Sequence, residues 1–158
     1  LPRIGIGIDV HRLGPGRRCV VGGLEFECEV GPIGHSDGDA LLHAACDAVL
    51  GAAGLDDLGT LFSDRDPRHA GRASHEFCHE VLELLRQRHL RVLSLDAVLE
   101  TERPKLAARR PELRARLAEL FALPVERVNV KGKTGEKVDA IGRGEAMRAT
   151  VVALLGPA

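Results

Sequence analysis

The chain has 158 residues, which is enough for one domain with a real core, and we expect a single domain over residues 1–158. A net charge of −1, the absence of Tyr and Trp, and the lack of any apolar run near 20 residues argue against nucleic-acid and membrane partners. The four cysteines show no CxxC spacing, which indicates reduced, mostly buried thiols of a cytoplasmic protein.

The first predicted element is a strand over residues 3–11, RIGIGIDVH. One side of this strand carries Ile4, Ile6, Ile8 and Val10. The other side carries Gly5, Gly7, Asp9 and His11. The glycines permit the close approach of another element or a ligand, and the strand ends with a carboxylate beside an imidazole. A dinucleotide-binding GxGxxG motif is excluded because Val10 stands where its third glycine is required.

A hairpin is predicted next, with strands over 19–21 and 24–30 around Gly22 and Gly23, followed by a central helix. Ser36 and Asp39 have capping-box spacing, so the helix is expected to begin there and to end near 51–54.

The central helix is unusual in its polar face. Asp39, His43 and Asp47 recur every fourth residue and share one face, where Lys, Glu and Arg are more usual. The opposite, apolar face carries Leu41, Ala45, Ala48, Val49 and Ala52. Backbone N–H groups at the helix mouth, next to His35 and Ser36, favour an anion. This pattern indicates a functional site.

The rest of the chain alternates between helical and strand patterns. Residues 56–71 form a long polar segment, either a lid that packs on a ligand or a plain surface loop. The elements expected after it are a helix over 74–89 capped by Ser74, a strand over 92–99, a helix over 111–123 and strands over 127–131 and 145–155. The order predicts an α+β fold, with a mixed four-stranded sheet, helices on one face and a small hairpin.

Asp9, His11 and His43 form a candidate metal site. Two imidazoles and one carboxylate suit zinc, and three protein ligands leave a fourth position open, as in catalytic sites. The alternative is that the Asp–His pair lies on the surface or only supports other ligands. Four other histidines show no such pattern and are expected to be solvated: His69, His75, His79 and His89.

Residues 131–137, KGKTGEK, offer cations, a hydroxyl and flexible backbone after a strand, which is good phosphate-binding chemistry. A Walker A loop is excluded because Arg127 stands where its first glycine is required. The plain alternative is a charged hairpin loop. Glu136, a carboxylate among lysines, favours a divalent ion that bridges phosphates.

Six segments, in the same order over nearly the whole chain, resemble the 2-C-methyl-D-erythritol 2,4-cyclodiphosphate synthase family of the non-mevalonate isoprenoid pathway. The segments are DVH at 9–11, HSDGDALLHAACDAVLGAAG at 35–54, DLGTLFSDRDP at 57–67, RPKL at 103–106, NVKGKTGEK at 129–137 and GRGEAM at 142–147. The resemblance implies a lyase that cyclises a CDP-linked methylerythritol phosphate and releases CMP. It also implies a homotrimer assembled around the sheets, with active sites between neighbouring subunits.

The resemblance assigns roles position by position. Asp9, His11 and His43 match the zinc ligands, and Glu136 matches the ligand of a second ion, Mg²⁺ or Mn²⁺. His35 and Thr134 match the transition-state stabilisers. The implied substrate-binding residues are Asp9, His11, His35, Ser36, Asp47, Asp57, Leu58, Gly59, Phe62, Asp64, Asp66, Pro104, Lys105, Leu106, Lys133, Thr134, Glu136 and Arg143.

The chain departs from the family pattern at Lys133, Gly135, Ser63 and the pair Asp139–Ala140. The family encloses an apolar channel at the trimer centre that can hold an isoprenoid diphosphate near an aromatic residue and an Arg. Ala140 takes the aromatic position, so weak binding, chiefly through Arg143, is expected. The uncovered sheet face is expected to include Val152 and Leu154, or else Val151 and Leu155.

Two other functions remain open from the sequence. A metal-dependent phosphohydrolase would use water in place of the internal phosphate, and a non-enzymatic protein would only bind an isoprenoid diphosphate or a nucleotide. Release of CMP without inorganic phosphate separates these alternatives from the cyclisation.

Overall fold

The chain is represented by a computed structural model that describes residues 1–34, 36–63 and 72–158. A mixed sheet of five strands has the order β4-β1-β7-β5-β6, and β2 pairs with β3 in a separate hairpin. The strands are β1 Arg3–Pro15, β2 Cys19–Val21, β3 Leu24–Phe26, β4 Val30–Pro32, β5 Leu90–Glu100, β6 Val128–Lys133 and β7 Ala146–Pro157. The helices are α1 Ala40–Ala53, α2 Leu58–Leu61, α3 Ser74–Gln87, α4 Arg110–Leu120 and α5 Asp139–Gly142, with short 3-10 turns η2 Ala107–Arg109 and η3 Val125–Arg127.

The α+β class and the mixed sheet are confirmed, but the prediction of four strands is wrong. The fifth strand is β4, which pairs with the end of β1 through Leu13 and Pro32. The predicted hairpin extends to Val30, whereas β3 stops at Phe26. A three-residue strand that contains Gly31 and Pro32 has no alternating pattern, so only the free edge of β1 identifies its place.

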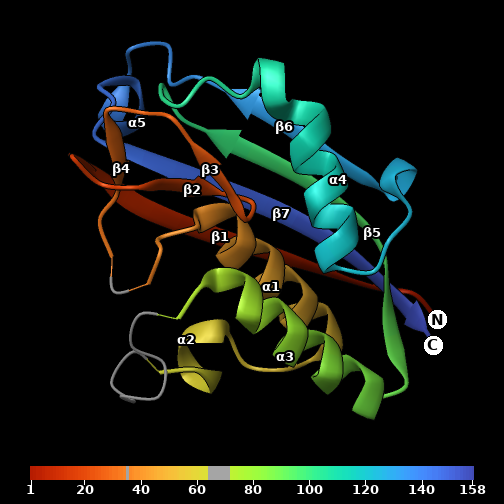
Figure 1. Cartoon of the computed structure of the whole chain (residues 1–158). Helices are drawn as coiled ribbons and strands as arrows, with labels where there is room; N and C mark the ends of the chain where they lie inside the picture. Colours follow the sequence, from red (N-terminus) through yellow and green to blue (C-terminus); the bar gives the residue numbers. More distant parts are fainter. Residues whose placement is uncertain (35, 64–71) are drawn as a thin grey trace.

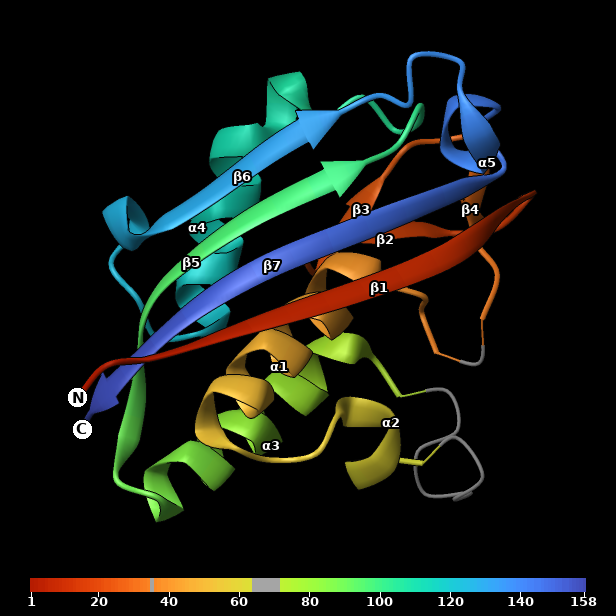
Figure 2. The same ribbon diagram turned by 180° about the vertical axis from the view of Figure 1, so that it is seen from behind.

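Helices α1, α3 and α4 cover one face of the sheet, and the view from behind shows the other face bare (Figures 1 and 2). β5 and β6 run parallel, which requires a crossover, and α4 provides it. The prediction of helices on one face is therefore confirmed. In the described part of the chain, no helix combines the length and apolar character that crossing a membrane would need.

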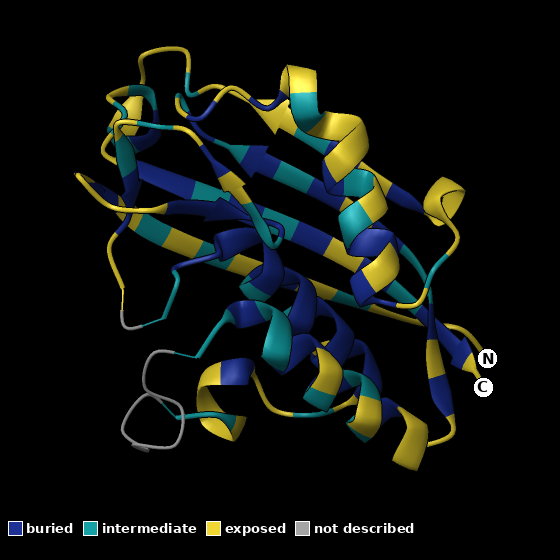
Figure 3. Cartoon of the chain, viewed as in Figure 1, coloured by how far each residue is buried: buried dark blue, intermediate teal, exposed yellow. Residues whose placement is uncertain are grey.

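The two sides of β1 differ as the alternation predicts. A Cβ built at Gly5 would lie 2.1 Å from the Ala48 carbonyl oxygen, and one at Gly7 would lie 2.0 Å from that of Ala44. Helix α1 therefore rests on bare backbone of β1, and Figure 3 shows it as the most buried helix. Close contact of this kind fixes the height of α1 above the strand.

The opposite side of β1 is exposed and apolar. Ile4, Ile6 and Ile8 are 73%, 62% and 57% exposed. The cross-strand partner of Ile6 is Val152, which is also exposed, whereas Val151 is buried. Of the two alternatives for the bare face, the one with Val152 and Leu154 is therefore correct.

Helix α1 begins later than predicted and uses a different cap. Asp39 is the N-cap, and its carboxylate accepts hydrogen bonds from the backbone N–H groups of Leu42 (3.1 Å), Gly22 (2.9 Å) and Gly23 (2.6 Å). Asp39 is fully buried, so its assignment to the polar face with His43 is wrong. The hairpin turn supplies two of the three donors, which a pattern within the helix cannot reveal. The helix ends at Gly54 in the left-handed region, as predicted.

The carboxylate cap also changes the expected anion site. Burial raises the pKa of Asp39 to about 6, against the lowering effect of its three backbone N–H donors. Because the N–H of Leu42 already donates to this side chain, the mouth of α1 does not present that group to an external anion. The anion-binding prediction for the rest of the helix mouth, which includes His35 outside the described residues, stays a prediction.

The cysteines are free thiols, as predicted, and three of them are buried. The Sγ atoms of Cys46 on α1 and Cys78 on α3 lie 3.7 Å apart at the contact between the two helices. Their hydrogen bond and their burial raise the pKa of Cys46 well above its ordinary value.

Candidate active site

Three side chains converge at the end of β1 and the start of α1. Asp9 Oδ2 lies 2.9 Å from His11 Nε2 and 3.1 Å from His43 Nδ1, and the two nitrogens are 3.4 Å apart. Ligand atoms around a tetrahedral zinc ion, with bonds of about 2.0–2.1 Å, lie about 3.3–3.4 Å from one another. The donor atoms are therefore nearly at the spacing that zinc requires, and the residues fit the metal.

The fold explains why these three side chains meet. Asp9 and His11 continue the helix-facing side of β1 begun by Gly5 and Gly7, and His43 lies in the first turn of α1. Since Gly7 brings α1 into backbone contact with β1 at Ala44, the neighbouring His43 is held over the strand end. Among the described residues, this trio is the one group of three or more His, Cys, Asp or Glu side chains close enough to share an ion.

The charges inside the cluster favour a cation. Burial opposes ionisation of Asp9, but hydrogen bonds with His11 and His43 outweigh it and place the pKa of Asp9 well below its usual range. The same hydrogen bond with Asp9 raises the pKa of His11 above its ordinary value, against the effect of burial. A carboxylate that stays ionised beside two imidazoles is a suitable zinc ligand set.

Sequence reasoning missed two residues behind His43. The Nε2 atom of His43 lies 2.8 Å from the hydroxyl of Ser74, and that hydroxyl donates to the carboxylate of Asp37. Ser74 was predicted to cap α3, but Ala73 is the N-cap and makes no side-chain cap bond. Asp37 lies in the HSDGD segment already singled out, yet nothing in the spacing links it to residue 74.

Asp47 and the segment 57–59, both implied substrate contacts, are brought together. Asp47 Oδ1 accepts the backbone N–H of Leu58 at 2.7 Å, and Asp57 caps α2 by accepting the N–H of Thr60 at 2.7 Å. Burial raises the pKa of Asp47, and the charge of Asp57 adds to that effect. Phe62, at the end of α2, packs against Phe77 with ring centroids 5.2 Å apart.

A second group of predicted residues forms a cavity of about 200 Å³ at the carboxyl ends of β5 and β6. Its lining includes Pro104, Lys105, Leu106, Lys133 and Thr134. The loop is fixed in place because Thr101 donates to the Arg103 carbonyl and the N–H of Gly135 donates to Glu102 at 2.9 Å. The structure thus joins the RPKL and GKT segments, which lie about 30 residues apart in the chain.

Glu136 and Arg143 lie outside both groups. Glu136 is exposed, has a positive φ of 49°, and accepts a hydrogen bond from Thr134 at 3.0 Å. Arg143 is exposed and pairs with Glu145 at 2.9 Å. Ser36 accepts the N–H of Gly38 at 3.2 Å. His35, Asp64 and Asp66 lie outside the described residues, as does the second half of the predicted lid, residues 64–71.

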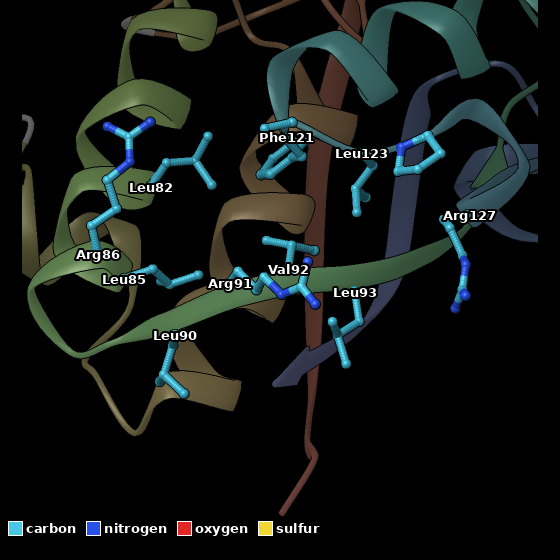
Figure 4. Close-up of a pocket in the computed structure, with 12 residues that line it drawn as sticks. Leu82, Leu85, Arg86, Leu90, Arg91, Val92, Leu93, Phe121, Leu123 and Arg127 are labelled. Atoms are coloured by element: carbon cyan, nitrogen blue, oxygen red, sulfur yellow. The ribbon is translucent and has the colours of Figure 1, made fainter. Parts of the chain in front are cut away.

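Another cavity, of about 260 Å³, lies between α3, β5 and the segment that follows α4 (Figure 4). Leucines and Phe121 form its floor, and Arg86, Arg91 and Arg127 stand around it. None of the predicted site residues lines this cavity. A cavity of about 1110 Å³ lies beside the second group, and its lining includes the predicted site residues Pro104 and Lys105.

Comparison with known proteins assigns the chain to a family. Residues 2–156 match the model of the YgbB family. The 2-C-methyl-D-erythritol 2,4-cyclodiphosphate synthase of Nitrosomonas eutropha is 44% identical over 153 residues, which cover 97% of this chain and 92% of the relative. A solved structure of a 2C-methyl-D-erythritol-2,4-cyclodiphosphate synthase in its CDP-bound form superposes with a TM-score of 0.91 at 42% identity, covering 98% of this chain and all of the other.

The chain also matches part of a longer protein. It superposes on the bifunctional IspDF from Campylobacter jejuni with a TM-score of 0.95 at 32% identity, covering all of this chain and 43% of that one. The family resemblance predicted from the sequence motifs is confirmed by these matches, and the chain belongs to the YgbB family.

Proposed function

We propose that this chain cyclises 4-diphosphocytidyl-2-C-methyl-D-erythritol 2-phosphate to 2-C-methyl-D-erythritol 2,4-cyclodiphosphate with release of CMP, in the non-mevalonate isoprenoid pathway. The reaction makes it a phosphorus–oxygen lyase, and its relatives carry the name of this cyclodiphosphate synthase. The observation that carries the proposal is the convergence of Asp9, His11 and His43 at zinc-like spacing in a chain of this family.

The chemistry needs two anionic groups to meet. The 2-phosphate oxygen attacks the β-phosphorus of the same molecule, and the bond from that phosphorus to CMP breaks. A zinc ion held by Asp9, His11 and His43 would supply Lewis-acid withdrawal of charge from a phosphate oxygen, with one coordination position open. No protein nucleophile is required, so positioning and electrostatic stabilisation carry the catalysis.

The other residues then bind and orient the substrate. His35 and Ser36 would contact a phosphate beside the metal, and Thr134 with Lys133 would stabilise charge from the opposite side. The cavity lined by Pro104 would bind the cytosine. Backbone groups beside Pro104 would form hydrogen bonds with the edge of its ring. Asp47 holds the Leu58 N–H with Oδ1, and its other carboxylate oxygen would contact the sugar.

The active site is proposed to form between subunits of a homotrimer. The metal cluster lies on β1 and α1, whereas the proposed cytosine cavity lies near the opposite edge of the sheet, at β5 and β6. The bare apolar face around Ile6 and Val152 supports burial against neighbouring subunits. In this arrangement the cavity of one subunit would face the metal cluster of the next.

Glu136 is proposed to hold a second ion, Mg²⁺ or Mn²⁺, which would neutralise charge on the diphosphate. Its exposed carboxylate next to Thr134 is available to an ion at the subunit boundary. An isoprenoid diphosphate at the trimer centre would meet Arg143. Because Arg143 is paired with Glu145 and Ala140 offers no ring, weak binding is expected.

Product analysis tests the proposed reaction against its rivals. The purified protein, supplied with zinc and Mg²⁺, should convert the CDP-linked phosphate substrate into equal amounts of CMP and cyclic diphosphate. Inorganic phosphate among the products would identify a phosphohydrolase instead. Binding of substrate without any CMP release, by protein shown to contain zinc, would identify a binding protein.

A further inference from the structure

The hydrogen bonds behind His43 connect the proposed metal centre, on which their role rests, to α3. Ser74 is 1% exposed, and its hydroxyl lies 2.8 Å from His43 Nε2. The same hydroxyl donates to Asp37 Oδ1, while the backbone N–H of Ser74 donates to Asp37 Oδ2 at 3.0 Å. Three side chains from three segments therefore form a chain of hydrogen bonds that ends on the imidazole.

We propose that Asp37 and Ser74 are positioning residues that hold His43 in the orientation and tautomer required for the metal. The hydrogens allow one consistent arrangement. When His43 Nδ1 is a metal ligand, its Nε2 carries the hydrogen and donates to the oxygen of Ser74. Ser74 then uses its own hydrogen on the carboxylate of Asp37. Each donor has one acceptor, and the carboxylate at the end makes the whole chain stronger.

The use of Ser74 supports a dedicated role. Ser74 is the first helical residue of α3, one position after the N-cap Ala73, so its hydroxyl does not occupy the cap position. Asp37, from a separate loop, accepts the Ser74 N–H at the start of the helix. The hydroxyl of Ser74 meanwhile bonds to Asp37 and His43, both outside α3, which directs it towards the metal ligand.

The two histidines of the cluster are supported differently. A backbone hydrogen bond with Ile33 acts on His11 from the strand side. His43 instead depends on side chains from the loop before α1 and from the start of α3, which lies 31 residues further along the chain. The orientation of His43 is therefore coupled to the docking of α3, and a change at residue 74 should reach the metal without touching it.

The test is zinc affinity, measured by competition with a chelator on metal-free protein. Ser74→Ala should weaken zinc binding about 10- to 100-fold, as the loss of such a partner does in other zinc sites. Ser74→Thr keeps the hydroxyl and should recover most of the affinity, and Asp37→Asn should give a smaller loss than Ser74→Ala. Ser94→Ala and Asp96→Asn, which change the same residue types on β5, serve as matched controls and should bind zinc like the native protein.

A spectroscopic readout separates positioning from a general loss of structure. In the zinc-loaded native protein, the His43 Nε2–H should exchange slowly with water and give an observable ¹H–¹⁵N imidazole signal. In loaded Ser74→Ala this signal should disappear while that of His11 persists. Equal zinc affinity in Ser74→Ala and Ser94→Ala would contradict the positioning role of Asp37 and Ser74 without contradicting the metal centre. Failure of the native protein itself to bind zinc would contradict both the positioning role and the metal centre.

Discussion

The two sides of β1 are built from alternate residues of one strand, yet they meet different surroundings. The inner side begins with Gly5 and Gly7, on which α1 rests, and ends with the metal-ligand pair Asp9 and His11. The outer side is a row of β-branched residues, with Ile6 62% exposed. The inner side is complete within one chain. The outer side exposes apolar surface that the proposed assembly would bury.

Strand β1 therefore serves both the folding of one chain and the proposed assembly of several. Glycine on the inner side sets the distance between helix and strand, and that distance brings His43 to the ligand pair. The apolar outer side has no partner among the described residues, so its stabilising effect depends on a second copy of the chain. Substitutions on the two sides should therefore fail in different ways, and the following experiments separate them.

The largest effect is expected at Gly7. A Cβ there would lie 2.0 Å from the Ala44 carbonyl oxygen, so Gly7→Val must push α1 away from β1. We expect the free energy of unfolding, measured with urea, to fall by at least about 3 kcal/mol. Gly51→Ala is the control, because a Cβ at that exposed helical position meets nothing within 4 Å. It should raise the stability by about 0.5–1 kcal/mol, and similar losses in both variants would contradict the close-contact argument.

The second effect concerns the metal. His43→Ala and His11→Ala should each reduce copurified zinc from about one ion per chain to nearly none, since two ligands do not hold zinc tightly. Elemental analysis of the purified variants gives the answer. Asp47→Asn, one turn further along α1, should keep its zinc because its carboxylate holds the Leu58 N–H instead. Full zinc occupancy in both histidine variants would remove the basis of the proposed reaction.

The third effect tests the outer side of β1. Ile6→Glu would place a carboxylate in the proposed subunit interface, where an unpaired charge costs several kcal/mol, so the trimer should dissociate at micromolar concentration. Sedimentation velocity should show a single-chain mass with zinc still bound. Val125→Glu puts the same charge at a residue that is 47% exposed and lies away from this face, and it should leave the assembly intact. A native protein that sediments as a monomer would refute the trimer directly.

The smallest effect is expected at Glu136. Glu136→Gln keeps the shape of the side chain and removes its charge, so the apparent affinity for Mg²⁺ or Mn²⁺ should fall about tenfold, or roughly 1.4 kcal/mol. Zinc content should stay at the native level, because Glu136 lies outside the Asp9–His11–His43 cluster. The measurement is the rate of CMP release at increasing Mg²⁺ concentration. An unchanged Mg²⁺ dependence would assign the second ion to another residue.

Much of the metal site could be predicted from the sequence because its signals are local. Alternation along residues 3–11 placed Asp9 and His11 on the side of the glycines, and helical spacing placed His43 near the start of the central helix. The end of that helix at Gly54 was also predictable, since glycine adopts the left-handed conformation without strain. The family motifs then linked segments that spacing alone could not connect.

Other features depend on partners from distant parts of the chain, so they could not be predicted from local pattern. Asp39 has the spacing of an exposed helical residue, but the N–H groups of Gly22 and Gly23 draw it into the core. Ser74 has the pattern of a helix cap, but Asp37 and His43 lie within reach and engage its hydroxyl. A short polar side chain forms its hydrogen bonds with whichever partners the packed elements bring near, and periodicity carries no record of them.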